Sequence, residues 1–178
     1  MTDVLLLVPT ATSEPAGFWH GRIVTLRSET LNLGRAFVMK ALTIKQPWVH
    51  AILHEGKDIE NRSWQRNFRG WLAIHASARP STQAGFPRGH HLPDLNALDY
   101  SAICGVARVV DIVTASRSKW FSRPDDGSVN FGWVLADATP LKNPIPCKGA
   151  LGLWTVAPKQ LREIQRQLPR LKLVNDQR

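Results

Sequence analysis

From Ala41 onward, apolar and polar positions alternate in short runs that are typical of β-strands. Leu42 and Ile44 alternate with Thr43 and Lys45, which is the two-residue period of a strand with one buried face. Further runs bounded by turn residues predict strands over residues 58–64, 71–77, 102–113, 131–136 and 151–156. Several short strands with few helices predict a mainly β fold, a small β-barrel with a few flanking helices.

Two segments have helical spacing instead. Trp48, Ala51 and Ile52 follow Pro47 at the spacing of one helix face, and Gly56 can adopt the left-handed conformation that ends a helix. A basic C-terminal helix is expected over residues 158–168; its apolar stripe is Leu161, Ile164 and Leu168, and its arginines are Arg162, Arg166 and Arg170. Residues 80–99 mix Gly, Pro, His and Asn, which predicts a long loop with at most one helical turn.

The regular pattern divides the chain into an extension and one domain. Residues 1–38 show no sustained period, apart from a short edge strand predicted at residues 23–26. We interpret residues 1–38 as an N-terminal extension, either disordered or reflecting a misassigned start, because Met39 would also serve as a first residue. The remaining residues, 39–178, have the length of one domain.

Charge points to an anionic partner. The net charge is +9, and residues 1–38 hold three basic and three acidic side chains, so the whole excess lies in the predicted domain. Clustered Lys and Arg attract polyanions such as RNA. The alternative is a basic surface that only confers solubility.

The cysteines and the apolar runs bear on location. Two cysteines, Cys104 and Cys147, are too few for a disulfide framework, which favours a reduced, cytoplasmic protein. The run from Val4 to Pro9 is too short for a signal peptide and follows Asp3 rather than basic residues, and no longer apolar run exists. We therefore expect neither export nor membrane insertion.

The segment after the first predicted helix carries the candidate chemistry. Glu60 and Arg62 are two residues apart on a predicted strand and face the same side, and Lys57 precedes them at the turn. These opposite charges can converge. One interpretation is an ion-pair cluster that fixes the turn. The other is a site in which Lys57 or Arg62 holds a phosphate or carbonyl and Glu60 moves a proton.

The sequence around these residues resembles the ASCH domain. The resemblance rests on residues 42–48, 57–64 and 70–77, and it continues through Gly105-Val106-Ala107, residues 131–135 and residues 146–154. It implies a PUA-like barrel with a cleft beside the first helix, and a role in RNA binding, RNA modification or translation control. The family signature is similar to Gly-x-Lys-x-x-Glu-x-Arg, and Lys57, Glu60 and Arg62 match it in register. Glu55 occupies the expected glycine position, and Gly56 follows one residue later.

Two enzymatic branches are implied by the resemblance. One resembles amidohydrolases that deacetylate acetylated cytidine nucleosides with a lysine, a threonine and a glutamate; Lys57 matches the lysine, but Glu60 stands at the threonine position. The other is a metal-independent ribonuclease, in which Lys57 and Arg62 stabilise the charged phosphorane and Glu60 accepts the 2′-hydroxyl proton.

Aromatic and basic residues supply further binding candidates. Trp48 and Trp64 flank the charged trio and are candidates for stacking on bases, whereas Trp133 and Trp154 lie in apolar strands and are expected in the core. The predicted RNA- or ligand-binding set is Lys45, Gln46, Trp48, Trp64, Arg66, Arg69, His75, Arg79, Arg108 and Lys148, with Arg162 and Arg166 as an extension of the basic surface.

No cofactor or metal is expected. His50 and His54 have a metal-compatible spacing, but no third ligand is obvious in the sequence. The strand position of His75 allows it to face a cleft, and the alternative, which we favour, is a hydrogen-bonded structural histidine. The sequence thus predicts an RNA- or nucleoside-binding protein with a basic cleft. A metal-independent ribonuclease, a nucleoside amidohydrolase and a protein-binding adaptor remain as alternatives.

Overall fold

The computed structural model describes residues 4–9, 21–26, 38–82, 85–91, 93–124 and 126–171. The chain divides into two units, residues 1–36 and 37–178. In the first unit, strand β1 (Val4–Pro9) pairs antiparallel with β2 (Gly21–Leu26), which includes the strand predicted at residues 23–26. The other predictions for residues 1–38 fall mostly on positions outside the described residues.

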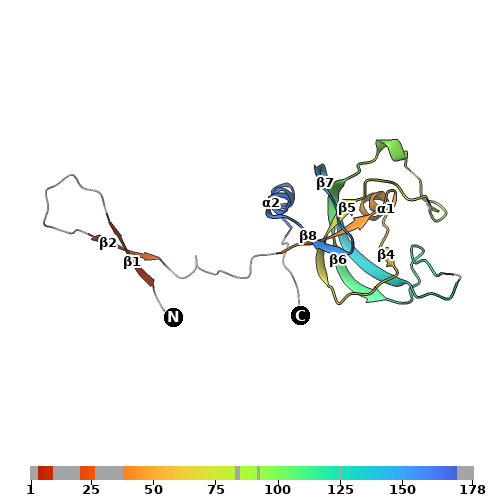
Figure 1. Cartoon of the computed structure of the whole chain (residues 1–178), viewed down its shortest axis with the longest axis horizontal. Coiled ribbons are helices and arrows are strands. Elements are labelled where there is room, and N and C mark those ends of the chain that lie inside the picture. Colours follow the sequence, from red (N-terminus) through yellow and green to blue (C-terminus); the bar gives the residue numbers. More distant parts are fainter. Residues whose placement is uncertain are drawn as a thin grey trace. The chain divides into compact units, whose positions relative to one another are not determined.

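The second unit is built on a curved, mixed sheet of six strands (Figure 1). Its strands are β3 (Lys40–Ile44), β4 (Ile59–Arg62), β5 (Gly70–Ala76), β6 (Ala102–Val113), β7 (Phe131–Pro146) and β8 (Leu153–Thr155), in the spatial order β4-β7-β6-β5-β3-β8. Only β3 and β5 pair in parallel; the other neighbours are antiparallel. The predicted mainly β class is confirmed, in the form of a half-barrel.

Two α-helices accompany the sheet. Helix α1 (Trp48–His54) follows β3, and helix α2 (Pro158–Gln167) follows β8, both close to their predicted positions. A 3-10 helix, η2 (Leu95–Ala97), supplies the single helical turn expected in the long loop. None of the helices in the described part of the chain is both long and apolar enough to traverse a lipid bilayer.

Two hydrophobic clusters occupy the two faces of the sheet. Because strand side chains alternate, Leu42 and Ile74 lie in one cluster, which includes residues of α1, while Ala41 and Ala73 lie in the other, with Ile164 of α2. Trp133 is fully buried, as expected, and Trp154 packs against the α2 cluster. The apolar stripe of α2 therefore serves to cover the outer face of the sheet.

Strand β7 is longer than predicted. The sequence pattern predicted a strand over residues 131–136, but the strand continues to Pro146, past the prolines at positions 140 and 144. Only its first part, Phe131–Val134, pairs with β4, so the remainder has a partner on one side alone. Proline is tolerated at such an edge because no ladder hydrogen bond is needed from its nitrogen.

Candidate functional site

The turn after helix α1 delivers Lys57 to the site. Gly56 has a positive φ of +67°, whereas Glu55 has an ordinary φ of −111°. The Lys57 N–H donates to the carbonyl oxygen of Ala51 at 2.9 Å, which closes the end of the helix. The glycine thus stands where the backbone requires one, one residue later than in the family signature, and the charged trio is preserved.

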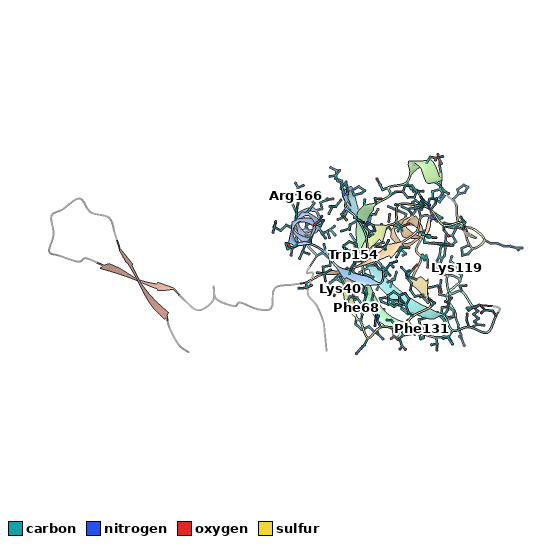
Figure 2. The ribbon with its side chains drawn as sticks, in the orientation of Figure 1. Lys40, Phe68, Lys119, Phe131, Trp154 and Arg166 are labelled. Atoms are coloured by element: carbon teal, nitrogen blue, oxygen red, sulfur yellow. The ribbon has the colours of Figure 1, made fainter. Side chains whose placement is uncertain are left out.

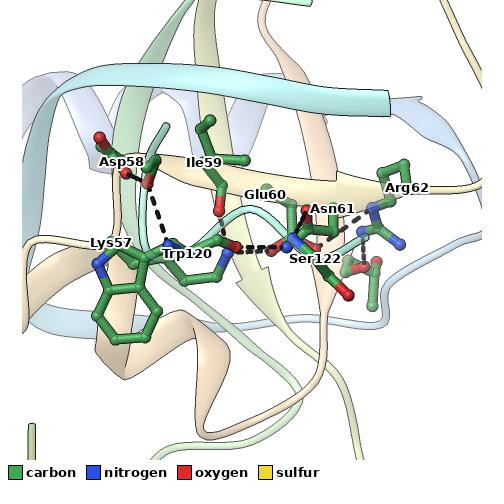
Figure 3. A network of polar contacts seen from close by, with 10 residues as sticks. Lys57, Asp58, Ile59, Glu60, Asn61, Arg62, Trp120 and Ser122 are labelled. Carbon is green, nitrogen blue, oxygen red and sulfur yellow. Dashed lines mark hydrogen bonds and ion pairs between the residues drawn. The ribbon is translucent and has the colours of Figure 1, made fainter. Parts of the chain in front are cut away.

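Glu60 lies between two cations. Its Oε2 is 3.4 Å from Lys57 Nζ, and its Oε1 is 3.4 Å from Arg62 Nε (Figure 3). Arg62 also donates from a terminal nitrogen to the carbonyl oxygen of Thr43 at 2.7 Å, which ties β4 to β3. The convergence of charges predicted from the sequence is therefore present.

Burial sets the chemistry of this trio. Lys57 and Glu60 are 3% and 7% exposed. Desolvation lowers the pKa of Lys57, and the neighbouring Glu60 carboxylate opposes that shift. The Lys57 ammonium also donates to the carbonyl oxygen of Ile59. Since an ammonium has three protons, one donor of Lys57 remains after Ile59 and Glu60.

A pocket of about 470 Å³ opens beside the Lys57–Glu60 pair. Five segments line it: the start of α1, the turn after α1, strand β4, the loop after β5 and the loop between β6 and β7. Its lining residues are Trp48, Lys57, Glu60, Asn61, Ser81, Gly85, Pro87, Lys119, Trp120, Phe121, Ser122 and Asn130. Its volume lies within the usual range for small-ligand sites, roughly 300–1,000 Å³.

The loop between β6 and β7 is fixed to β4 by hydrogen bonds (Figure 3). Asn61 donates from Nδ2 to the carbonyl oxygen of Trp120 at 2.8 Å and accepts from the Ser122 N–H at 3.0 Å. Ser118 donates from its hydroxyl to Asp58 Oδ1 at 2.5 Å. These bonds hold Trp120 and Phe121 at the wall of the pocket.

Aromatic rings surround Lys57. Phe86 stacks on Trp48 with 5.4 Å between ring centroids and meets Trp120 edge-on at 5.7 Å. Lys57 Nζ lies 5.8 Å from the Trp48 centroid and 6.0 Å from the Trp120 centroid. Rings near a cation stabilise it through their π-faces, so the cationic form of Lys57 has support despite its burial.

Gln46, Lys45 and Arg79 lie outside the lining of this pocket. Gln46 is buried, where it accepts from the His50 N–H and donates to the carbonyl oxygen of Asp99 at 3.0 Å. Lys45 and Arg79 are exposed in the segments that follow the parallel strands β3 and β5. The contacts of Gln46 are those of a structural residue that secures α1.

Trp64, Arg66 and Arg69 lie together after β4, away from the pocket lining. The Trp64 ring meets Trp133 edge-on at 5.0 Å and lies within 5.9 Å of the Arg66 guanidinium carbon. Arg69 pairs with Asp111 at 2.5 Å. Trp120, not Trp64, shares the pocket wall with Trp48.

His75 and Lys148 line a second cavity, of about 310 Å³, together with Thr43. The His75 Nε2 lies 3.0 Å from the carbonyl oxygen of Cys147, and burial lowers the pKa of the imidazole. Gly149 covers the ring so closely that a Cβ there would lie 2.5 Å from His75 Cε1. These contacts match the structural interpretation of His75.

The remaining predicted cations lie on other surfaces. Arg108 pairs with Asp137 at 2.8 Å, and Arg166 of α2 pairs with Glu163 at 2.7 Å. Figure 2 shows Arg166 and Lys119 on opposite sides of the domain. The arginines of α2 therefore do not extend the pocket that Lys119 lines.

Several lining residues were not predicted from the sequence, notably Asn61, Lys119, Trp120, Phe121 and Asn130. The usable signal was the pair Trp120-Phe121 within a polar, basic stretch between two strands. Such an aromatic pair in a loop has to be covered by neighbouring elements or exposed at a site.

The described residues contain no group of three or more His, Cys, Asp or Glu side chains placed to hold a metal ion. His50 and His54 have ring centroids 4.9 Å apart, and His50 Nε2 lies 3.8 Å from Glu55 Oε1. Desolvation, followed by the neighbouring His54, lowers the pKa of His50. Glu55 also accepts a contact from the loop after β5, where His90 Nδ1 lies 3.2 Å from Glu55 Oε2. These polar contacts join the end of α1 to that loop.

Fold and site together define a small β half-barrel domain with a polar and aromatic pocket beside its first helix. Comparison with protein-family models matches residues 42–139 to the ASCH domain. The chain belongs to the ASCH domain family. No curated protein matches the sequence.

The solved structures that resemble the chain include two of an ASCH protein from Zymomonas mobilis. The crystal structure of ASCH from Zymomonas mobilis has 12% sequence identity and a TM-score of 0.47, covering 72% of this chain and 94% of that one. A serine-to-alanine mutant of the same protein has 14% identity and a TM-score of 0.46, with the same coverage.

Proposed function

We propose that the pocket beside Lys57 binds a base of RNA or a modified nucleoside. The observation that carries the proposal is the buried Lys57–Glu60 pair in a pocket whose walls include Trp48, Trp120 and Phe121. Bases are commonly held by stacking on aromatic rings combined with hydrogen bonds to their polar edges. The site offers both kinds of contact.

Polar groups around the pocket suit the edge of a base. Lys57 has a donor left after its contacts with Ile59 and Glu60, and the Glu60 carboxylate oxygens accept. Asn130 lines the same pocket and donates from Nδ2 to the carbonyl oxygen of Ser122. Fixed donors and acceptors of this kind favour a ligand with a defined hydrogen-bonding pattern over a purely apolar one.

Titration of a short, fluorescein-labelled single-stranded RNA tests the proposal, with cytidine and N4-acetylcytidine as free-nucleoside probes. Replacing Trp48 by leucine removes a wall of the pocket, whereas the matched change Trp64→Leu leaves the pocket lining intact. We expect Trp48→Leu to weaken binding by about 1–3 kcal/mol, the usual value of one aromatic stack, and Trp64→Leu to leave it within error. Equal effects would contradict the assignment of the pocket.

The same geometry favours a hydrolase as a second candidate. A buried lysine of lowered pKa beside a carboxylate is an arrangement suited to proton transfer. In RNA cleavage, the 2′-oxygen would bond to phosphorus as Glu60 takes its proton, and the bond to the 5′-oxygen would break as Lys57 supplies a proton to that oxygen. The Arg62 guanidinium, which holds Glu60 and the Thr43 carbonyl, would position the carboxylate.

Incubation with labelled RNA in EDTA, followed by fragment analysis, tests this candidate. Cleavage by the wild type that is lost in Lys57→Met supports the ribonuclease. Release of acetate from N4-acetylcytidine, lost in the same variant, supports the amidohydrolase instead. Binding without either reaction supports a binding module, and the lack of both binding and reaction favours the protein-binding adaptor.

The two free cysteines are in keeping with a cytoplasmic protein, and we propose that location for this one.

A further inference from the structure

The loop between β6 and β7 carries three exposed cations, one of which lines the pocket. They are Arg117, Lys119 and Arg123, and the sequence from residue 114 to residue 124 contains no Asp or Glu. Within the described ranges, no carboxylate lies at ion-pair distance from any of the three. Positive charge is thus concentrated on residues 117–123, and the carboxylates of the same loop, Asp125 and Asp126, follow this stretch in the sequence.

This segment is held in place. Ser118, between two of the cations, donates to Asp58 and accepts from the Trp120 N–H at 3.1 Å. Asn61 binds the backbone at Trp120 and Ser122, the two positions that flank Phe121. A fixed backbone lowers the entropy lost when the cations contact a ligand.

The three cations are close in sequence to residues that line the pocket: Arg117 lies two residues before Lys119, and Arg123 directly follows Ser122. Lys119 lines the pocket, and its neighbours Trp120 and Phe121 form part of the wall. By contrast, Arg69 and Arg108 form ion pairs, with Asp111 and Asp137 respectively. Lys119 therefore lies where a ligand leaving the pocket would pass, and Arg117 and Arg123 lie on the same fixed segment.

We propose that Arg117, Lys119 and Arg123 bind the phosphates of a single-stranded RNA whose base occupies the pocket. This inference rests on the proposed function and narrows its ligand to a polynucleotide strand, since a free nucleoside has no phosphate for these cations to contact. Backbone contacts of this kind are independent of sequence and are weakened by salt, because binding releases condensed counterions.

The experiment measures the affinity of full-length protein for a short, fluorescein-labelled single-stranded RNA over a range of KCl concentrations. The test variant is Arg117→Gln/Lys119→Gln/Arg123→Gln. The matched control is Lys159→Gln/Arg162→Gln/Arg170→Gln, which removes the same charge from exposed positions of α2 and its C-terminal end. Thermal unfolding establishes that both variants remain folded.

We expect the loop variant to bind more weakly with a shallower salt dependence. Each phosphate contact with a single strand contributes about 0.7 to the slope of log K against log salt, so three contacts reduce the slope by about 2 and the affinity by about 100-fold near 0.1 M salt. The affinity for free cytidine should not change. The α2 variant should keep the wild-type slope.

Each other outcome decides against the inference. An unchanged slope in the loop variant, with RNA still bound by the wild type, overturns the phosphate assignment and leaves the pocket proposal standing. Equal losses in the loop and α2 variants would mean diffuse attraction by net charge, which also overturns it. Failure of the wild type to bind RNA, with cytidine or N4-acetylcytidine still bound, overturns this inference and leaves nucleoside binding by the pocket standing. Failure to bind either RNA or these nucleosides removes the proposed function as well.

Discussion

Lys57 Nζ lies 3.4 Å from Glu60 Oε2, and both side chains are buried. The second oxygen of the same carboxylate lies at the same distance from Arg62 Nε. One buried carboxylate is thus the shared counter-charge of two cations. Removing the carboxylate should therefore change the stability of the domain more than removing either cation does.

Glu60→Gln should destabilise the domain more than Lys57→Met. The first change leaves two cations close together without a counter-charge, and breaking a buried pair in this way costs about 3–5 kcal/mol. The second change leaves Glu60 paired with Arg62 and replaces the ammonium by an apolar group of similar length. Urea unfolding of the three proteins measures the difference. A larger loss for Lys57→Met would refute the shared role of Glu60.

The contribution of Lys57 to the free energy of unfolding should change with pH in the alkaline range. Burial lowers its pKa below the ordinary value near 10.5, so between the folded and unfolded pKa values the unfolded chain binds more protons. The free energy of unfolding attributable to Lys57 must then rise with pH through that window. The difference between wild type and Lys57→Met, followed by urea unfolding at increasing pH, should grow in favour of the wild type. A flat or falling difference would contradict the lowered pKa.

The sequence predicted the regular parts of the molecule because the physical cause of each is local. The alternation in β3 and β5 reflects the two apolar clusters on opposite faces of the sheet. Gly56 ends α1 because the backbone at its position has a positive φ, which glycine adopts without strain. The extension of β7 was missed because its edge position, which makes Pro140 acceptable, depends on the pairing of distant strands.

Part of the candidate site was also predictable, because the positions of its charged residues are set by local structure. Lys57, Glu60 and Arg62 lie on one turn and one strand, so their spacing alone places them together. Trp120 and Asn130 reach the pocket from an irregular loop, where no period connects them to β4. The hydrogen bonds of Asn61 that create this proximity span about sixty residues and leave no pattern in the sequence.

His75 should make the domain sensitive to acid. Desolvation lowers its pKa below 6.5, so as the pH falls through the window from about 6.5 to the folded value, the unfolded chain gains a proton that the folded chain resists. Stability is lost over that window and is fully present above it. The wild type should therefore lose more free energy of unfolding than His75→Gln between neutral and acidic pH. Parallel pH profiles would exclude a buried neutral imidazole.

Gly149 should not tolerate a side chain. A Cβ at this position would lie 2.5 Å from His75 Cε1 and 2.6 Å from Thr43 Oγ1, inside normal contact distances. Gly149→Ala is expected to cost about 1–3 kcal/mol, as overpacking usually does. Gly85→Ala is the control, since nothing lies within 4 Å of its added Cβ and its φ is not in the left-handed region. Equal unfolding midpoints for the two variants would rule out the close approach to His75.

Asn61 should control the order of the loop that carries Trp120. Its side chain binds the carbonyl oxygen of Trp120 and the N–H of Ser122, so Asn61→Ala removes both contacts while leaving β4 paired with β7. The Ser122 amide should then exchange with solvent deuterium faster, by roughly 5–10-fold for a lost hydrogen bond of about 1 kcal/mol. Asn96→Ala, at an exposed position of η2, should leave that amide unchanged. If exchange at Ser122 were equally slow in all three proteins, the loop would have to be held by its packing, with Trp120 at 5% exposure as the anchor, and the hydrogen bonds of Asn61 would be secondary.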